Sequence, residues 1–163
     1  MYYPDLTPYQ YRSESGQPAV DGVAPALNVG WIDSAYPYPQ GAVPDALVAR
    51  LWAFGHTPVG LFRGFHECPF CDADPRTYLV VRQGDDKIGM GNGEIWVFGD
   101  DGPAYAAPTL IYHYVVEHRY RPPDAFIQAI LDSPLPGSPE YEGRAGQYVW
   151  GQHMLRMKRF LGT

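Results

Sequence analysis

Two pairs of metal-binding residue types stand apart in this sequence. Cys68 and Cys71 form a C-x2-C pair, and His113 and His118 form an H-x4-H pair further along the chain. Both spacings are typical of tetrahedral zinc sites in which each pair supplies two of the four ligands. The sequence therefore predicts one Zn²⁺ ion bound by these four side chains.

The histidine pair imposes a condition on the backbone. Side chains five residues apart on an ideal helix point about 140° apart, because each turn takes 3.6 residues. The two rings converge only if the helix tightens or ends, and the paired prolines that follow predict such an end before Tyr120. His66, two residues before the first cysteine, is the alternate ligand; it would replace one of the later histidines.

The same residues admit other chemistry. If only three protein groups bind the metal, a water molecule completes the site, and Glu67 or Glu117 would act as general base of a zinc-dependent hydrolase. The Cys-Pro-Phe-Cys segment also resembles a glutaredoxin-type motif, but Asp72 and Asp74 follow it where that motif requires a helix. A zinc deaminase needs H-x-E well before P-C-x-x-C, an order that this chain lacks. Buried cysteines and histidines without any metal are the remaining interpretation.

Composition restricts the class of protein. A chain of 163 residues with 45% apolar residues suits a single folded domain over 1–163 rather than a disordered chain. Its net charge of −6 argues against nucleic acid as a partner, since phosphate neutralisation needs a concentrated basic patch. The sequence shows no signal peptide, no membrane span and no cysteine spacing suited to a structural disulfide. We expect a cytoplasmic protein that does not enter a membrane.

The first 42 residues carry the prolines and tyrosines of an extended segment. Six prolines exclude a long helix there, and we expect 1–42 to wrap around an α+β core formed by 43–163. Within this segment, 27–33 is predicted to be a strand. Further strands are predicted at 59–62, 77–82, 94–98 and 104–107, with turns at 84–86 and 89–93.

Four helices are predicted from capping residues and apolar spacing. They lie at 44–55, at 108–120, from 123 or 124 to about 131, and from 138 towards the C-terminal end. In the last of them, Trp150, Met154, Met157 and Leu161 recur at helical spacing. The expected fold is α+β, with a small, mostly antiparallel sheet, about four helices and a proline-rich N-terminal wrap.

Three stretches of the chain resemble a known family. They are 5–11 (DLTPYQY) together with 28–31 (NVGW), 63–71 (RGFHECPFC), and 105–126 (YAAPTLIYHYVVEHRYRPPDAF). Together they are similar to a family of small bacterial proteins that is defined only as a domain of unknown function. The resemblance covers roughly residues 1–131, and it implies a bacterial origin without implying an activity or a ligand.

The functional expectation therefore rests on the metal. The leading hypothesis is a zinc-stabilised, non-enzymatic protein that acts through a binding partner, another protein, with the aromatic and arginine residues around Tyr120 as its contact surface. The alternative is the zinc-dependent hydrolase. A third hypothesis, an immunity or antitoxin-like protein, matches the size and acidity of the chain only.

Overall fold

The computed structural model describes residues 1–12, 14–61, 63–72, 79–100 and 102–161. In these residues the elements follow the order β1 (Leu27–Asn28), α1 (Asp45–Gly55), β2 (Leu79–Gln83), β3 (Asp86–Met90), β4 (Glu94–Phe98), β5 (Ala104–Pro108), α2 (Ile111–Glu117), α3 (Asp124–Asp132), α4 (Pro139–Ala145) and α5 (Val149–Leu161).

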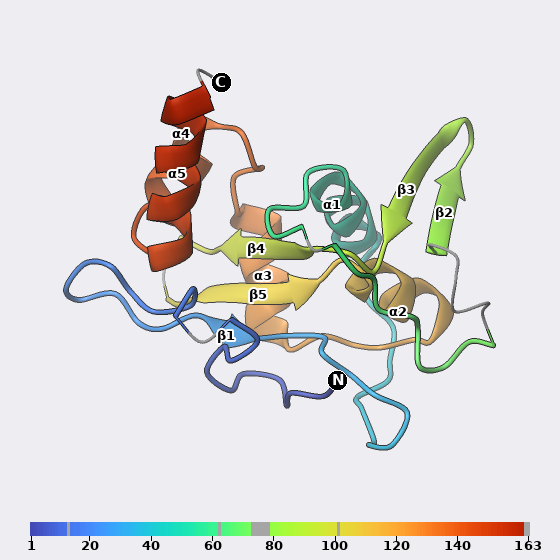
Figure 1. Cartoon of the computed structure of the whole chain (residues 1–163). Coiled ribbons are helices and arrows are strands. Elements are labelled where there is room, and N and C mark those ends of the chain that lie inside the picture. The colour runs from blue at the N-terminus through green and yellow to red at the C-terminus, as the bar shows by residue number, and fades with distance from the viewer. Residues whose placement is uncertain (13, 62, 73–78, 101, 162–163) are drawn as a thin grey trace.

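A three-stranded sheet of order β1-β5-β4 lies at the centre of the molecule (Figure 1). β5 pairs antiparallel with β4 and parallel with β1. Every residue of β4 and β5 is buried, because helices and loops cover both faces of these strands. α3 packs on β4 and on α1, and α1 also contacts α2. This arrangement confirms the predicted α+β class.

The second sheet is the hairpin of β2 and β3, which has the order β2-β3. The sequence prediction of a turn at 89–93 was wrong in part, because β3 occupies Asp86–Met90. The alternation of buried Ile88 and Met90 with exposed neighbours is the strand signal that the surrounding glycines obscured. Gly84 opens the two-residue turn with a φ of +57°, a conformation that suits glycine.

The N-terminal segment runs antiparallel to residues 26–31 along the edge of the central sheet. Backbone amides of the first nine residues donate hydrogen bonds to the carbonyl oxygens of Ala26, Asn28 and Trp31. The half-buried Asp5 carboxylate accepts hydrogen bonds from the Gly30 amide at 2.9 Å and the Tyr120 hydroxyl at 2.8 Å. The segment is therefore fixed both to the sheet and to the chain that follows α2.

One strand prediction was too long and another was wrong. The predicted strand 27–33 is reduced to β1, because the chain turns at Gly30, where φ is +73°. A Cβ at Gly30 would lie 2.9 Å from the Ile111 side chain, so the close approach of α2 also requires glycine there. In the predicted strand 59–62, residues 59–61 are not in a strand and residue 62 lies outside the described residues. Residues 77 and 78 of the predicted strand 77–82 also lie outside them.

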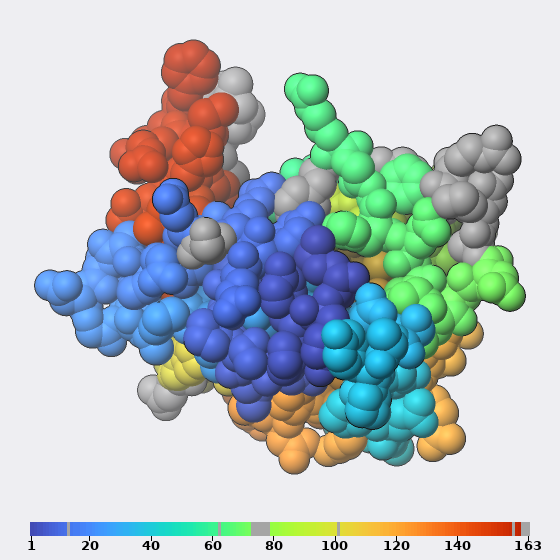
Figure 2. All heavy atoms as spheres, turned by 60° about the horizontal axis from the view of Figure 1, so that its bottom comes forward, coloured from blue at the N-terminus to red at the C-terminus, as the bar shows by residue number. Residues whose placement is uncertain are grey.

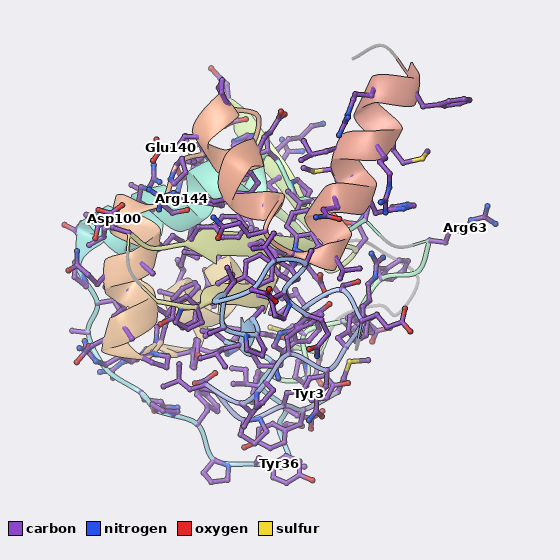
Figure 3. All side chains as sticks on the ribbon, turned by 90° about the vertical axis from the view of Figure 1, so that its left-hand side faces the viewer. Tyr3, Tyr36, Arg63, Asp100, Glu140 and Arg144 are labelled. Atoms are coloured by element: carbon purple, nitrogen blue, oxygen red, sulfur yellow. The ribbon has the colours of Figure 1, made fainter. Side chains whose placement is uncertain are left out.

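The sequence predicted one continuous C-terminal helix, and this prediction was wrong. α4 and α5 are separate helices, and between them the buried Tyr148 hydroxyl accepts the Ala104 amide and donates to the Ala24 carbonyl. Arg144 fixes α4 to the end of β4 by donating to the carbonyl oxygens of Phe98 and Gly99. Figure 3 shows Arg144 beside its two ion-pair partners, Asp100 and Glu140. No helix in the described part of the chain is long and apolar enough to cross a membrane.

A buried carboxylate connects β4 with the N-terminal segment. Glu94 accepts hydrogen bonds from the Tyr9 hydroxyl at 2.6 Å and from the Trp96 indole at 3.2 Å. Burial raises the pKa of Glu94 above its ordinary value of 4.5, and the two hydrogen bonds only partly oppose that effect. The native state therefore holds the proton of Glu94 more tightly than the unfolded chain does.

This difference predicts the effect of Glu94→Gln on the pH dependence of stability. The raised native pKa gives wild type a stabilising contribution that is complete below pH 4.5 and is lost as pH rises through the native pKa. The variant lacks this contribution, while its amide can still serve both partners. The free energy of unfolding of wild type minus that of Glu94→Gln should therefore fall with rising pH. Urea titrations of both proteins at matched pH values measure this difference, and a difference that is flat or rises would contradict the prediction.

Candidate metal centre

The two cysteines lie in a tight turn on the loop between α1 and β2. The Cys71 amide donates to the Cys68 carbonyl oxygen at 3.3 Å, which closes the turn and brings both residues to one side. The loop is held to the end of β3 because the His66 amide donates to the Gly91 carbonyl oxygen at 2.7 Å. Gly91 has a φ of +100°, and a Cβ there would lie 2.3 Å from the His66 carbonyl oxygen. Only glycine allows this approach.

The two histidines lie at the end of α2. The helix ends at Glu117, and the Tyr114 carbonyl oxygen accepts the amides of both His118 and Tyr120, at 3.2 and 3.0 Å. The prediction that the helix ends before Tyr120 is confirmed, although α2 begins at Ile111 rather than at the predicted 108. Because the backbone leaves the helix at His118, its ring turns towards His113 and the two Nε2 atoms lie 3.1 Å apart.

The four side chains of the predicted zinc site form one cluster, in which the ligand atoms all lie within 4.8 Å of one another. The Cys68 Sγ atom lies 3.2 Å from His118 Nε2. The Cys71 Sγ atom lies 3.3 Å from the Nε2 atoms of His113 and His118. Zinc–nitrogen and zinc–sulfur bonds of ~2.0–2.3 Å give a tetrahedron with edges of ~3.3–3.8 Å. The cluster is thus compatible with a single metal ion.

Burial favours the uncharged forms of Cys68 and His113 when no cation is bound. It raises the pKa of the Cys68 thiol to about 11, and the neighbouring Cys71 adds to this effect. Burial also lowers the pKa of His113, as does the adjacent His118. Neutral imidazoles have the free lone pair that a metal needs, and a bound divalent cation would stabilise the thiolates.

Aromatic rings lie beside the four-residue cluster and connect it with the N-terminal segment. The Phe70 ring lies 5.1 Å from the His118 ring and 5.0 Å from the Tyr38 ring, measured between centroids. The Tyr38 hydroxyl donates to the His118 carbonyl oxygen at 3.2 Å. Sequence reasoning missed both Phe70 and Tyr38. The position of Phe70 between the cysteines was a usable signal, whereas nothing local connects residue 38 with the site.

The other predicted site residues lie outside the four-residue cluster. The alternate ligand His66 is near the Tyr11 hydroxyl instead, with 3.2 Å between that oxygen and Nε2. Glu67 is exposed and lines a pocket of about 90 Å³ together with His66, Pro69 and Tyr114. Glu117, the last residue of α2, is also exposed.

The contact surface expected around Tyr120 cannot include Tyr120 itself. Tyr120 is fully buried, and its hydroxyl is bound to Asp5, so it is unavailable to a partner. The Arg121 guanidinium donates to the Ala42 carbonyl oxygen at 2.5 Å and forms an ion pair with Asp124 at 2.6 Å. Tyr120 thus joins the N-terminal segment to the chain after α2, and Arg121 joins that chain to Ala42 and to α3. Local sequence does not reveal such long-range contacts.

Comparison with known proteins supports the resemblance found in the sequence. The chain belongs to the family described as domain of unknown function DUF7919, whose match covers residues 1–131. Comparisons with curated proteins and with solved structures gave no significant match. The family match includes all four residues of the Cys68, Cys71, His113 and His118 cluster and ends within α3, so that α4 and α5 follow it.

The contact between Gly91 and the cysteine loop gives a prediction with a matched control. Gly91→Ala places a methyl group against the His66 backbone at positive φ, so it should destabilise the protein by about 1–3 kcal/mol. Gly89→Ala adds the same methyl group in β3 where nothing lies within 4 Å, and it should change stability by less than about 1 kcal/mol. Thermal unfolding of both variants tests this, and equal melting temperatures would contradict it.

Proposed function

We propose that Cys68, Cys71, His113 and His118 bind one Zn²⁺ ion that stabilises the fold, and that the protein acts by binding another protein. One observation carries the proposal: four ligand atoms from two distant segments meet within 4.8 Å. Two thiolates and two imidazoles form a ligand set characteristic of structural zinc.

A structural role follows from the number and the location of these ligands. A Zn²⁺ ion held by four protein groups has no open position for water, so it does not generate a nucleophile. Its bonds would instead join the loop after α1 to the end of α2, and Phe70 and Tyr38 extend that connection to the N-terminal segment. The residues joined lie more than forty positions apart, where a cross-link most restricts the unfolded chain.

Serine substitutions test the metal. Wild type should contain one zinc per chain by elemental analysis, whereas Cys68→Ser and Cys71→Ser should lose it and melt at a lower temperature. His66→Ala is the control; it should keep the metal because His66 lies outside the cluster. Replacement of zinc by Co²⁺ should give the visible absorption of a tetrahedral thiolate site. Full metal content and stability in the Cys68→Ser, Cys71→Ser double variant would contradict the proposal.

The hydrolase alternative has its own test. The pocket beside Cys68 that Glu67 lines is the observation in its favour. Our proposal predicts no zinc-dependent turnover of ester, phosphoester or peptide substrates by the zinc-loaded protein. The opposite result is that the zinc-loaded protein turns over such a substrate, and that Glu67→Gln or Glu117→Gln abolishes this turnover with the zinc content still at one per chain. That result would replace the hypothesis of a binding protein with that of a zinc hydrolase.

A further inference from the structure

The outer face of α5 exposes apolar side chains that nothing in the described structure covers. Phe160 is 84% exposed and Met157 is 46% exposed, and Val149 lies on the same side of the helix. The side facing the body carries Gly151, which is buried, and Met154, which is half-buried. Figures 1 and 2 show α5 projecting beyond the rest of the molecule. Met157 therefore lies towards solvent although it shares the helical spacing of Trp150 and Met154, and the side chain of Leu161 lies outside the described residues.

The charge of α5 is opposite to that of the whole chain. The helix contains Arg156, Lys158 and Arg159 and no acidic residue, whereas the complete sequence has a net charge of −6. The rest of the molecule must therefore be more acidic than the chain as a whole. An exposed helix that is both basic and apolar favours an acidic partner surface with an apolar recess.

Such a recess lies on the same chain at the base of α5. A groove of about 510 Å³ is lined mainly by apolar residues from the loops before β2 and before α4, from α4 and from α5, and its polar lining residues are His56, Thr57 and Glu142. Its apolar residues include Pro58, Val59, Leu61, Pro136 and Met154. Leu61 is 61% exposed, so its side chain is accessible at this groove.

We propose that α5 joins two copies of this chain into a symmetric dimer. Phe160 of each copy would enter the groove beside Leu61 of the other copy, so that Arg159 would arrive near Glu142. The two α5 helices would then lie antiparallel. A two-fold axis between the copies would form both Phe160–groove contacts at once, and under that symmetry the assembly closes as a dimer and does not continue into a filament.

The charge distribution favours a second copy over a lipid surface. An anionic bilayer would attract α5 but repel the acidic remainder of the protein. In a dimer the two acidic remainders also repel each other, but each one lies beside the basic helix of the other copy, so that opposite charges meet at the contact. The interface is small, because α5 is only ~20 Å long and a standard interface buries ~800 Å² per partner. We therefore expect a weak dimer, with a dissociation constant in the micromolar range.

Sedimentation equilibrium of the full chain over a range of concentrations tests the proposal. Phe160→Asp and Leu61→Asp should each weaken dimerisation at least about tenfold. The symmetric dimer has two Phe160–groove contacts, and each substitution places a charge in both of them. Leu6→Asp is the control: Leu6 is 44% exposed and lies on the N-terminal segment, so this variant should dimerise like wild type. Circular dichroism and melting temperature verify that each variant is folded.

A mixture of the two variants distinguishes reciprocal exchange from other contacts. In a mixed dimer, the intact Phe160 of the Leu61→Asp chain meets the intact groove of the Phe160→Asp chain, so the mixed dimer should be tighter than either variant alone. A monomeric wild type, or a dimer unaffected by Phe160→Asp, would overturn the proposal. Phe160-dependent binding of monomeric wild type to phosphatidylserine vesicles would replace it with a lipid contact. Zinc content does not enter this test, so its failure leaves the proposed metal site unaffected.

Discussion

The carbonyl oxygen of Tyr114 accepts two backbone amides, and the rest of the structure depends on the chain reversal that results. Its bonds to the amides of His118 and Tyr120 end α2 and turn the chain back at once. Arg119 completes the reversal with a φ of +56°. One backbone acceptor thus positions a ring of the metal centre on one side and the Tyr120 hydroxyl on the other.

Buried polar contacts then hold the N-terminal segment to this framework. Asp5 joins Gly30 to Tyr120, and Glu94 joins Tyr9 to Trp96. Such groups are costly to desolvate, and they stabilise only when their partners are in place, so they select one arrangement of an otherwise extended segment. The proline-rich segment therefore belongs to the core even though it has little secondary structure.

The metal centre and α5 belong to different parts of the chain. All four cluster residues lie within the family match over 1–131, and they join segments that the sheet already brings near each other. α4 and α5 lie beyond that match. The proposed zinc would stabilise the region shared with the family, while the proposed dimer contact would be a property of the segment that follows it.

Local sequence was sufficient where backbone geometry decides the outcome. The C-x2-C turn, the end of α2 ahead of two prolines, and the apolar spacing of α1 and α3 depend on residues that are neighbours in the chain, and the structure contains all of them. The residue types and spacings of the two ligand pairs likewise indicated one metal cluster, because few other arrangements bring such groups together.

Tertiary structure decided which side of each element is covered. His66 was as good a ligand as His118 by spacing, but its amide is bound to Gly91 and its ring lies beside Tyr11. Tyr120 is buried because Asp5, far away in the sequence, reaches it, whereas Phe160 is exposed because no described element packs over that end of α5. Helical spacing predicts that a residue shares a face with its neighbours. Whether that face meets the core depends on segments distant in the sequence, because tertiary packing, and not helical periodicity, decides which side chains are buried.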